Sequence, residues 1–424
     1  MRKRIFIFML FILAFDLTAQ IQEEISEDKP QKSPITFSQP RHLFAVFNHK
    51  SVESSLSQLD VYWQFVNDIL LFVKTDDEKY LAKYELNIDL LDDNKNIIDS
   101  FSKTEEILTS KFEEANSNLA VNAGKATMLA KPGNYTLRIE LRDRDSGNFL
   151  LRDRKIELKD FSGKKTTLSD VLLVDALDVE KSETEYQINL SGHFSDSTSF
   201  CGAYFEIYPE NSKEKIEVEK RIIDSNGKAV FSENTEYATD RPVIKEWIQF
   251  KNKVRYLGRY LLEINVKGLK ELSVKKYFFM NWNNTPFEIP SIDQVAEMLD
   301  DLGNADELKE ISKAEPEEKE KIWDAFWKKR DPSPGTPENE LREEFFKRLE
   351  FTFRHFTVHS KDKVGWKTDR GKVYLRYGEP TWVRRYVTDL RRPALEVWYY
   401  ESVLNKFMFY DREGEGEYKL KEVQ

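Results

Sequence analysis

The sequence predicts a multidomain protein, with two all-β sandwiches in tandem followed by an α+β domain in which helices precede a small antiparallel sheet. Three observations support this prediction. Apolar and polar residues alternate in runs over residues 42–285, which is the period of half-buried strands. After residue 286 apolar residues recur every three to four positions, which is the period of helices. The chain also has 424 residues, too many for one ordinary core, so two to three domains are expected.

The N-terminal residues indicate an export signal. A basic start precedes an apolar run from Ile5 to Phe15 that is too short to span a bilayer. Leu17-Thr18-Ala19 offers a small residue before a cleavage point, so residues 1–19 are predicted to be a signal peptide, with an uncleaved anchor as the alternative. A polar, flexible leader is expected over residues 20–41. We therefore expect an exported protein, periplasmic or at the cell surface or secreted, with no transmembrane span in the mature chain.

The first sandwich is predicted over residues 42–165. Apolar residues alternate along Tyr84–Leu90 and again along Tyr135–Leu141, which indicates strands. The segment Asp143–Gly147 has the acidic residues of a calcium loop. It lacks the downstream glutamate of that motif, so a hairpin turn is expected instead.

The second sandwich is predicted over residues 166–285. Asp224-Ser225-Asn226-Gly227 indicates a hairpin, because Asn-Gly accepts positive φ at both central positions. Gly133–Leu141 and Gly258–Val266 share an alternating pattern led by Gly-x-Tyr, so the two sandwiches are predicted to be similar and immunoglobulin-like. The single cysteine, Cys201, can form no intrachain disulfide, and its apolar context predicts a buried thiol.

The C-terminal domain is predicted over residues 286–424. Pro316 suits the first turn of a helix that has acidic residues at its start. Thr336-Pro337 is expected to begin a long helix with a Phe-lined face. Beyond that helix, Gly365–Pro380 predicts a turn, a strand over residues 372–377 and a second turn. Three more strands are expected before the end of the chain.

One block in this domain resembles a known family. Gly365-Trp366-Lys367-Thr368-Asp369 resembles the signature of the bacterial GWxTD domain family. The likeness covers about residues 290–424, through segments 326–332, 336–340, 371–380 and 396–400. The resemblance implies an export signal and a β-rich region ahead of the domain. It implies no established activity, so no catalytic residue is carried over from it.

The same block has a complete structural interpretation. Its glycines permit a tight or left-handed backbone, and a Thr-Asp pair can bond nearby backbone amides. The tryptophan can fill a core. We therefore predict a structural motif made of Gly365, Trp366, Thr368, Asp369, Gly371, Gly378 and Pro380.

Catalysis is the alternative for this region. Asp369, Glu379 and Glu396 are acid/base candidates for a glycan or peptide hydrolase. The sequence has no Gly-rich phosphate loop and no Gly-x-Ser-x-Gly elbow, so a binding or structural role is favoured. No cofactor is predicted. No metal site is predicted either, because His355 and His359 lack a supporting carboxylate and have basic neighbours.

A basic stretch predicts an anionic partner. The chain has a net charge of −10, yet residues 361–392 hold ten Lys or Arg against four acids. A solvated basic surface is the simpler alternative, and export makes nucleic acid an unsuitable partner. The binding candidates are Arg370, Arg376, Trp382, Arg384, Arg385, Arg391 and Arg392.

The expected function is that of a non-enzymatic interaction or scaffold module of the bacterial envelope. Its partner would be an envelope protein or a surface polymer. A small-ligand site between the helices and the C-terminal sheet is a third possibility.

Overall fold

A computed structural model describes residues 40–423 apart from 54, 116, 118–119, 179–184, 195–199, 211–214, 252, 255, 268–271, 281–291, 302–312, 337–338, 359–360, 362 and 387–392. The predicted signal peptide and nearly all of the predicted leader lie outside the described residues. So do Pro337, His359, Arg391 and Arg392.

Residues 42–158 form the first β unit, which consists of two facing sheets. One sheet has the order β1-β2-β6, and the other has the order β3-β4-β7-β8 with β5 also paired to β4. The strands are β1 (His42–Lys50), β2 (Ser57–Val66), β3 (Val73–Lys74), β4 (Tyr80–Leu91), β5 (Ile97–Thr109), β6 (Val121–Ala130), β7 (Gly133–Asp143) and β8 (Phe149–Leu158), with the short helices η1 (Asn67–Ile69) and α2 (Phe112–Ala115). Inward-facing residues at every second position, such as Tyr84, Leu86 and Ile88, make its core.

Residues 167–280 form the second β unit, which also has two sheets. Their orders are β11-β10-β13-β16, with β9 paired to β13, and β12-β18-β17-β14-β15. The strands are β9 (Thr167–Leu168), β10 (Leu172–Asp178), β11 (Glu185–Ile188), β12 (His193–Phe194), β13 (Gly202–Tyr208), β14 (Lys215–Ile223), β15 (Ala229–Ala238), β16 (Ile244–Gln249), β17 (Gly258–Val266) and β18 (Ser273–Met280). The core between the sheets contains Cys201, as predicted, and burial raises the pKa of its thiol to about 12.

Residues 292–423 form the C-terminal unit, in which helices lie on one face of a four-stranded antiparallel sheet with the order β19-β20-β21-β22. Its elements are α3 (Ile292–Asp301), α4 (Pro316–Lys329), α5 (Glu340–Phe356), η4 (Gly365–Lys367), α6 (Asp369–Tyr377), β19 (Trp382–Tyr386), β20 (Ala394–Tyr400), β21 (Asn405–Asp411) and β22 (Lys419–Val423). No helix in the described part of the chain is both long and apolar enough to cross a membrane.

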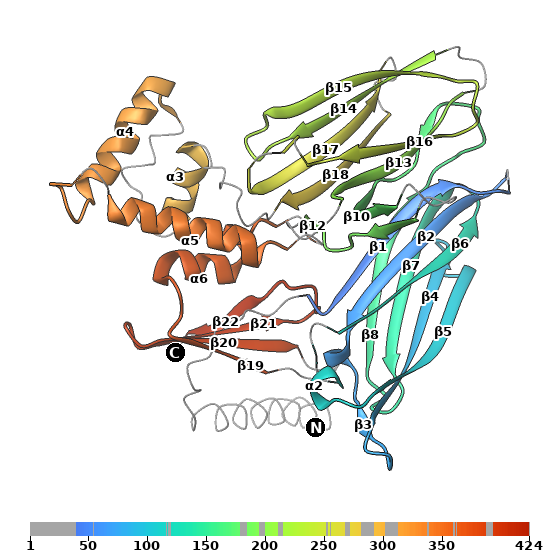
Figure 1. The fold of residues 1–424 in the computed structure, drawn as a ribbon, viewed down its shortest axis with the longest axis horizontal. Helices are drawn as coiled ribbons and strands as arrows, with labels where there is room; N and C mark the ends of the chain where they lie inside the picture. The colour runs from blue at the N-terminus through green and yellow to red at the C-terminus, as the bar shows by residue number, and fades with distance from the viewer. Residues whose placement is uncertain are drawn as a thin grey trace, which may run out of the picture.

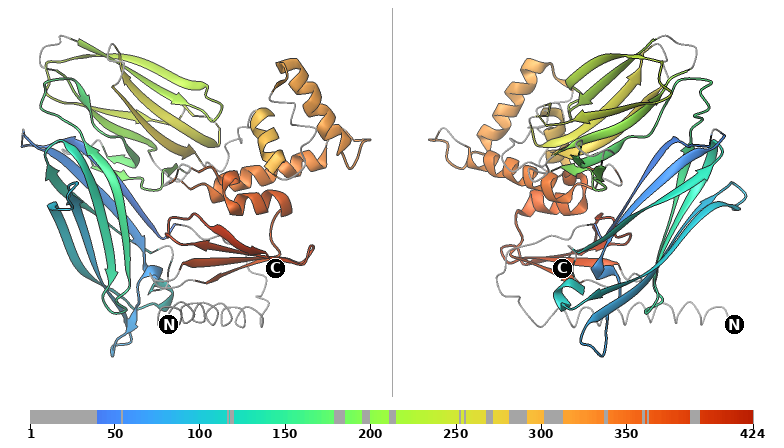
Figure 2. Two further views of the ribbon diagram at one scale, coloured as in Figure 1. Left: turned by 180° about the vertical axis from the view of Figure 1, so that it is seen from behind. Right: turned by 45° about the vertical axis from the view of Figure 1, so that its right-hand side comes forward.

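The three units meet around a common centre (Figures 1 and 2). The first and second β units lie against each other, and α5 lies beside the end of the second unit. Phe279 of β18 joins the core formed by α3, α4 and α5, and its ring lies 6.4 Å from that of Phe353. The sheet of the C-terminal unit lies beneath α5 and α6, next to the start of β1. Strands therefore dominate the fold, most of them antiparallel, and the described helices are confined mainly to the C-terminal unit.

Two expectations for the C-terminal unit are wrong. Residues 372–377 belong to helix α6 and not to a strand. The alternation of that segment misleads because α6 is buried on two sides, against α5 and against the sheet, so Val373, Tyr374 and Leu375 are all covered. Helix α5 begins at Glu340, and its cap is Asn339, whose side chain accepts a hydrogen bond from Arg342 N. Thr336 instead turns back onto Ser333. The expected start at Pro316 is confirmed for α4.

Candidate functional site

The two glycines of the Gly365–Gly371 segment are required by close backbone contacts. A Cβ atom on Gly365 would lie 1.8 Å from the carbonyl oxygen of Thr352 in α5. A Cβ atom on Gly371 would lie 2.0 Å from the carbonyl oxygen of Gly365. Neither glycine has a positive φ. Any side chain at either position would push α5, η4 and α6 apart, so these glycines fix how closely the three elements pack.

Thr368 and Asp369 organise the start of α6. Thr368 is the N-cap: its hydroxyl accepts from Gly371 N at 3.0 Å and donates to Gly365 O at 2.6 Å. The Asp369 carboxylate accepts from the backbone N–H of Leu420 at 2.8 Å. This bond ties the helix to the last strand, β22. Both side chains therefore serve the backbone, as the structural interpretation of the motif predicts.

The remaining motif residues close the two ends of α6. Trp366 is buried in the core shared by α3, α4 and α5. Gly378 ends the helix with φ 77°, in the left-handed region that favours glycine. The Tyr400 hydroxyl donates to Gly378 O at 2.8 Å, and Pro380 is buried at the entry to β19. The motif thus holds a helix between a helical core and a sheet.

Arg370 and Glu396 form a buried ion pair under this helix. Arg370 is 3% exposed, Glu396 is 0% exposed, and their charged groups lie 3.4 Å apart. The same Glu396 oxygen accepts from the indole N–H of Trp398 at 2.6 Å. The Arg370 guanidinium also stacks over the Tyr418 ring at 4.2 Å. Arg370 was predicted to bind a partner at the surface, but the structure places it in the interior.

The three carboxylates considered for catalysis lie in three different environments. Asp369 bonds a strand backbone, and Glu396 is buried in an ion pair. Glu379 is exposed at the turn after α6. Arg376, a predicted binding residue, is also exposed on α6. The sequence places these groups close together along the chain, but the fold does not bring the carboxylates into one cleft.

Part of the basic stretch is neutralised by an acidic turn. Lys361 lies 2.6 Å from Glu413 and 2.9 Å from Glu417, and Lys363 lies 3.1 Å from Glu417. Burial would lower the pKa of Lys361, but its hydrogen bonds to these carboxylates outweigh burial and raise it. These lysines hold the β21–β22 turn against the segment after α5.

Residues of β19, β20 and β21 form the outer face of the C-terminal sheet, which is turned away from α5 and α6. Leu395, Val397 and Met408 form a buried aliphatic floor. Half-buried aromatic rings and cations lie over this floor, together with the exposed Lys421 of β22. Trp382 stacks on Tyr399, Arg384 lies over Tyr386, Lys406 lies over Tyr399 and Lys421 lies over Tyr410. The Tyr399 hydroxyl and Arg384 Nη1 are buried without a hydrogen-bond partner in the described structure.

The two adjacent arginines of β19 do not act together. Successive residues of a strand point to opposite faces, so Arg384 belongs to the outer face while Arg385 points to the other side. Burial raises the pKa of Asp68 in the first β unit, and the charges of Arg41 and Arg385 partly offset that rise. The charge of Arg385 therefore reaches Asp68 of the first β unit. Sequence reasoning missed Lys406 and Lys421, which join the outer face only through strand pairing.

A cavity of about 1150 Å³ lies where the three units meet. The first β unit contributes the edge strands β1 and β8, and the second contributes β10, β11, β12 and β18. The C-terminal unit contributes the end of α5 and the β21–β22 turn. Arg370 of the motif also lines it. No single stretch of sequence predicts this cavity, because its walls come from segments far apart in the chain.

Three of the five histidines of the chain line this cavity. Burial, with nearby arginines, lowers the pKa of His42 to about 3 and that of His355 to about 4. Burial and His355 lower the pKa of His193 to about 4, although a hydrogen bond with the Thr357 backbone opposes the shift. All three are therefore neutral at pH 7. Among the described residues, no three His, Cys, Asp or Glu side chains could hold a metal ion.

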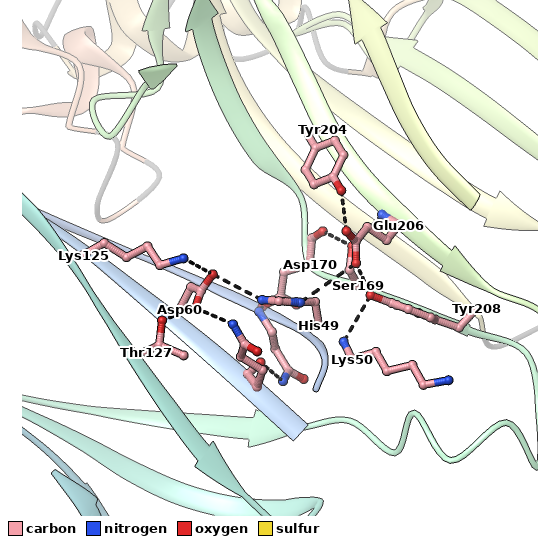
Figure 3. Close-up of polar contacts among 12 residues, drawn as sticks. His49, Lys50, Asp60, Lys125, Thr127, Ser169, Asp170, Tyr204, Glu206 and Tyr208 are labelled. Atoms are coloured by element: carbon pink, nitrogen blue, oxygen red, sulfur yellow. Dashed lines mark hydrogen bonds and ion pairs between the residues drawn. The ribbon is translucent and has the colours of Figure 1, made fainter. Parts of the chain in front are cut away.

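A polar cluster fixes the joint between the two β units (Figure 3). His49 Nε2 lies 3.2 Å from Asp60, and its Nδ1 lies 4.0 Å from Glu206 of the second unit. Burial would raise the pKa of Asp60, but hydrogen bonds from His49, Lys125, Gln58 and Thr127 outweigh it and hold the pKa well below its usual range. Glu206 accepts from the hydroxyls of Tyr204 and Tyr208. The cluster thus links β1 and β2 of the first unit to β13 of the second.

Comparison with known proteins identifies one region of the chain. Residues 258–423 match the family model described as GWxTD domain. The match begins at the first residue of β17, so it includes the β17–β18 pair whose Phe279 packs on α5. No curated protein matches the chain.

Three solved structures show distant likeness. The first is trypsin-activated alpha-2-macroglobulin from Escherichia coli, at 12% identity over 59% of this chain and 17% of that chain, with a TM-score of 0.18. The second is red sea bream transglutaminase, at 11% identity over 57% and 31%, with a TM-score of 0.18. The third is Parabacteroides merdae beta-glucuronidase with glycerol in its active site, at 12% identity over 57% and 34%, with a TM-score of 0.21. This chain spans about a third or less of each structure, and likeness at these scores carries no argument.

Proposed function

This chain contains a GWxTD domain, which places it among the GWxTD domain-containing proteins, and on that premise we propose that it is an exported bacterial envelope protein with a non-enzymatic interaction role. Its two β units act as immunoglobulin-like spacers. Its C-terminal unit is an α+β domain that docks an anionic partner, either an envelope protein or a surface polymer. Folds of these kinds serve many functions, so the proposal rests on particular side chains.

The proposal of export rests on the N-terminal sequence. The basic start, the apolar run and the small residues at Thr18 and Ala19 suit a secretory signal. The mature N-terminus tests this directly: a chain that begins near Gln20 in an envelope or secreted fraction supports export. An intact Met1 in a cytosolic fraction contradicts it.

The observation that carries the docking role is the outer face of the C-terminal sheet. Trp382, Arg384, Tyr386 and Tyr399 are aromatic or arginine side chains, the types enriched at the centres of protein interfaces. They are half-buried, so their rotamers are already restricted and little conformational entropy is lost on binding. Lys406 and Lys421 make the face positive, which suits an anionic partner.

The geometry gives the hydrolase alternative less support. A glycosidase needs two carboxylates facing one substrate across a few ångströms. Asp369 bonds a backbone amide, Glu396 is buried under α6, and Glu379 is exposed on a turn. Each carboxylate thus has a local structural task or a solvated position.

Affinity recovery from an envelope fraction tests the docking role. The full chain is compared with Arg384→Glu/Lys406→Glu, which reverses two charges on the outer face. A matched control, Lys328→Glu/Lys347→Glu, makes the same charge change on exposed helical positions. We expect the outer-face variant to lose at least tenfold of the recovered partner at an unchanged melting temperature, while the control retains it. Equal recovery with all three chains would contradict the proposal.

A further inference from the structure

The cavity between the three units has features of a ligand site that the proposed docking face does not use. Its volume of about 1150 Å³ lies just above the usual range of roughly 300–1,000 Å³ for small-molecule pockets. Its lining combines apolar groups, such as Phe44 and Leu172, with many charged side chains. A site formed between domains is also a common location for ligands.

The acidic side chains that line the cavity are already engaged. Asp170 lies 2.8 Å from Lys159 and accepts from Asn48 N at 2.9 Å. Asp153 lies 2.7 Å from Arg138. Glu413 and Glu415 both contact Lys361. Each of these carboxylates thus already has a cation as a close partner, and Lys276 has no carboxylate within ion-pair distance in the described part of the chain.

Two lining cations stand apart from these pairs. Arg154 and Lys276 have no ion-pair or hydrogen-bond partner in the described part of the chain. Both lie on the core-facing side of a strand. Arg154 shares its face of β8 with Ile156 and Leu158, which pack in the first core, but its own side chain is exposed. Lys276 shares its face of β18 with Val274 and Phe278, which pack in the second core, and it is half-buried. A partly buried charge such as that of Lys276 is costly unless a counter-charge is present.

The two cations also act on each other. Burial and then the charge of Arg154 lower the pKa of Lys276, and Asp170 opposes only part of this shift. Like charges from two different units therefore act on each other across the cavity that both line. In all, the described lining holds seven Arg or Lys side chains against four Asp or Glu, although Arg354 and Arg370 are paired with Glu350 and Glu396 outside it. The field in the cavity favours a ligand with more than one negative charge.

From this arrangement we infer that the cavity binds a multiply charged organic anion of oligosaccharide or nucleotide size, with one acidic group held between Arg154 and Lys276. The carboxylate or phosphate accepts charge-assisted hydrogen bonds from both cations. The apolar lining contacts the carbon skeleton. Because the two cations belong to different β units, the ligand would also tie those units together. This site is separate from the proposed docking face and does not depend on it.

Calorimetric titration of the full chain with three probes tests the inference. The probes are a trimer of galacturonic acid, which carries carboxylates, inositol hexakisphosphate, which carries phosphates, and the neutral sugar maltotriose. We expect at least one anion to bind with a Kd below 1 mM (a threshold of about −4 kcal/mol), with an affinity that falls as salt is raised. Which anion binds identifies the acidic group. Failure of both anions, or equal binding of maltotriose, overturns the inference.

A pair of variants assigns the binding to these residues. Arg154→Gln/Lys276→Gln should weaken the bound anion at least tenfold. Lys155→Gln/Lys245→Gln removes the same charge from exposed positions outside the cavity lining and should leave the affinity within twofold. Without ligand, the Arg154→Gln/Lys276→Gln protein should melt no lower than the unmodified chain, because two mutually repelling charges are gone. A lower melting temperature, or an equal loss of affinity in the control, would contradict the assignment.

Discussion

Replacing Glu396 with glutamine tests whether the buried pair beneath α6 is structural. Glutamine keeps the shape of the side chain and an oxygen that can accept from Trp398 Nε1, which now bonds Glu396 at 2.6 Å. It removes only the negative charge. Arg370, which is 3% exposed, would then be buried without a counter-charge.

The expected cost is a substantial part of the stability of the C-terminal unit. Removing one partner of a buried ion pair destabilises a protein by about 3–5 kcal/mol. Arg370 keeps a bond to Gly416 O at 3.3 Å and contacts with the Tyr418 and Phe356 rings. The lower end, about 3 kcal/mol, is therefore expected. Arg370→Met/Glu396→Gln removes both charges, so it should recover much of that loss.

Urea unfolding followed by tryptophan fluorescence gives the free energies for the four proteins of this double-mutant cycle. We expect Glu396→Gln and Arg370→Met each to lower the free energy of unfolding more than Arg370→Met/Glu396→Gln does. Additive effects of the two single changes, or a Glu396→Gln protein as stable as the unmodified chain, would refute the idea that these charges depend on each other.

Three further predictions concern the motif and the cavity. Gly371→Ala places a Cβ atom 2.0 Å from Gly365 O and should lower the unfolding free energy by about 3 kcal/mol or more. The control Gly335→Ala, whose Cβ atom meets nothing within 4 Å, should change it by less than about 0.5 kcal/mol. Similar values for the two variants would show that the close contact is unimportant. Thr368→Ala should cost about 1 kcal/mol through loss of the α6 cap, and Thr368→Ser should restore most of it; equal loss in both variants would argue against capping. His193 and His355 have folded-state pKa values of about 4 against an ordinary 6.5, so as the pH falls these histidines are protonated in the unfolded chain before they are protonated in the folded one. The stability that they contribute as neutral groups is therefore complete above pH 6.5 and is lost as the pH falls toward 4. The unfolding free energy should therefore drop between pH 7.5 and 5.5 by up to about 1.4 kcal/mol per pH unit for each fully titrating histidine, and His355→Phe should flatten this slope; an unchanged slope would contradict the assignment.

The local alternation of apolar and polar residues predicted those elements in which buried and exposed positions follow one regular spacing. Tyr84, Leu86 and Ile88 alternate because one face of β4 meets the core of its unit. Asp224–Gly227 forms the predicted turn between β14 and β15, but only Gly227, at φ 80°, has the positive φ that was expected for both Asn226 and Gly227. Asp143 caps the predicted hairpin turn by accepting from the backbone of Asp145 and Ser146. In each case the physical cause lies within a few residues of the feature.

The same reasoning failed for α6 because that helix exposes only a narrow face, marked by Lys372 and Arg376. Val373, Tyr374 and Leu375 are consecutive and all buried, since α5 covers one side and the sheet covers the other. The residues at the two ends of the segment indicate a helix more clearly than its apolar residues do. Thr368 at one end and Gly378 at the other suit a helix of nine residues.

The site features that sequence could not supply depend on long-range contacts. Arg384 and Lys406 share a face only because β19, β20 and β21 pair in register. Arg154 and Lys276 approach the same cavity from different units. Arg370 looked like a surface cation in sequence, and only its partner Glu396, far along the chain, shows why it is buried.

Partner recovery with Arg370→Met/Glu396→Gln tests most directly the central claim that the motif supports the fold while recognition occurs elsewhere. We expect this folded protein to retain the partner captured by the unmodified chain, because both charges are buried away from the outer face. Arg384→Glu/Lys406→Glu should lose that partner under the same conditions. A folded Arg370→Met/Glu396→Gln protein that loses the partner at least tenfold, while the outer-face variant keeps it, would contradict the claim.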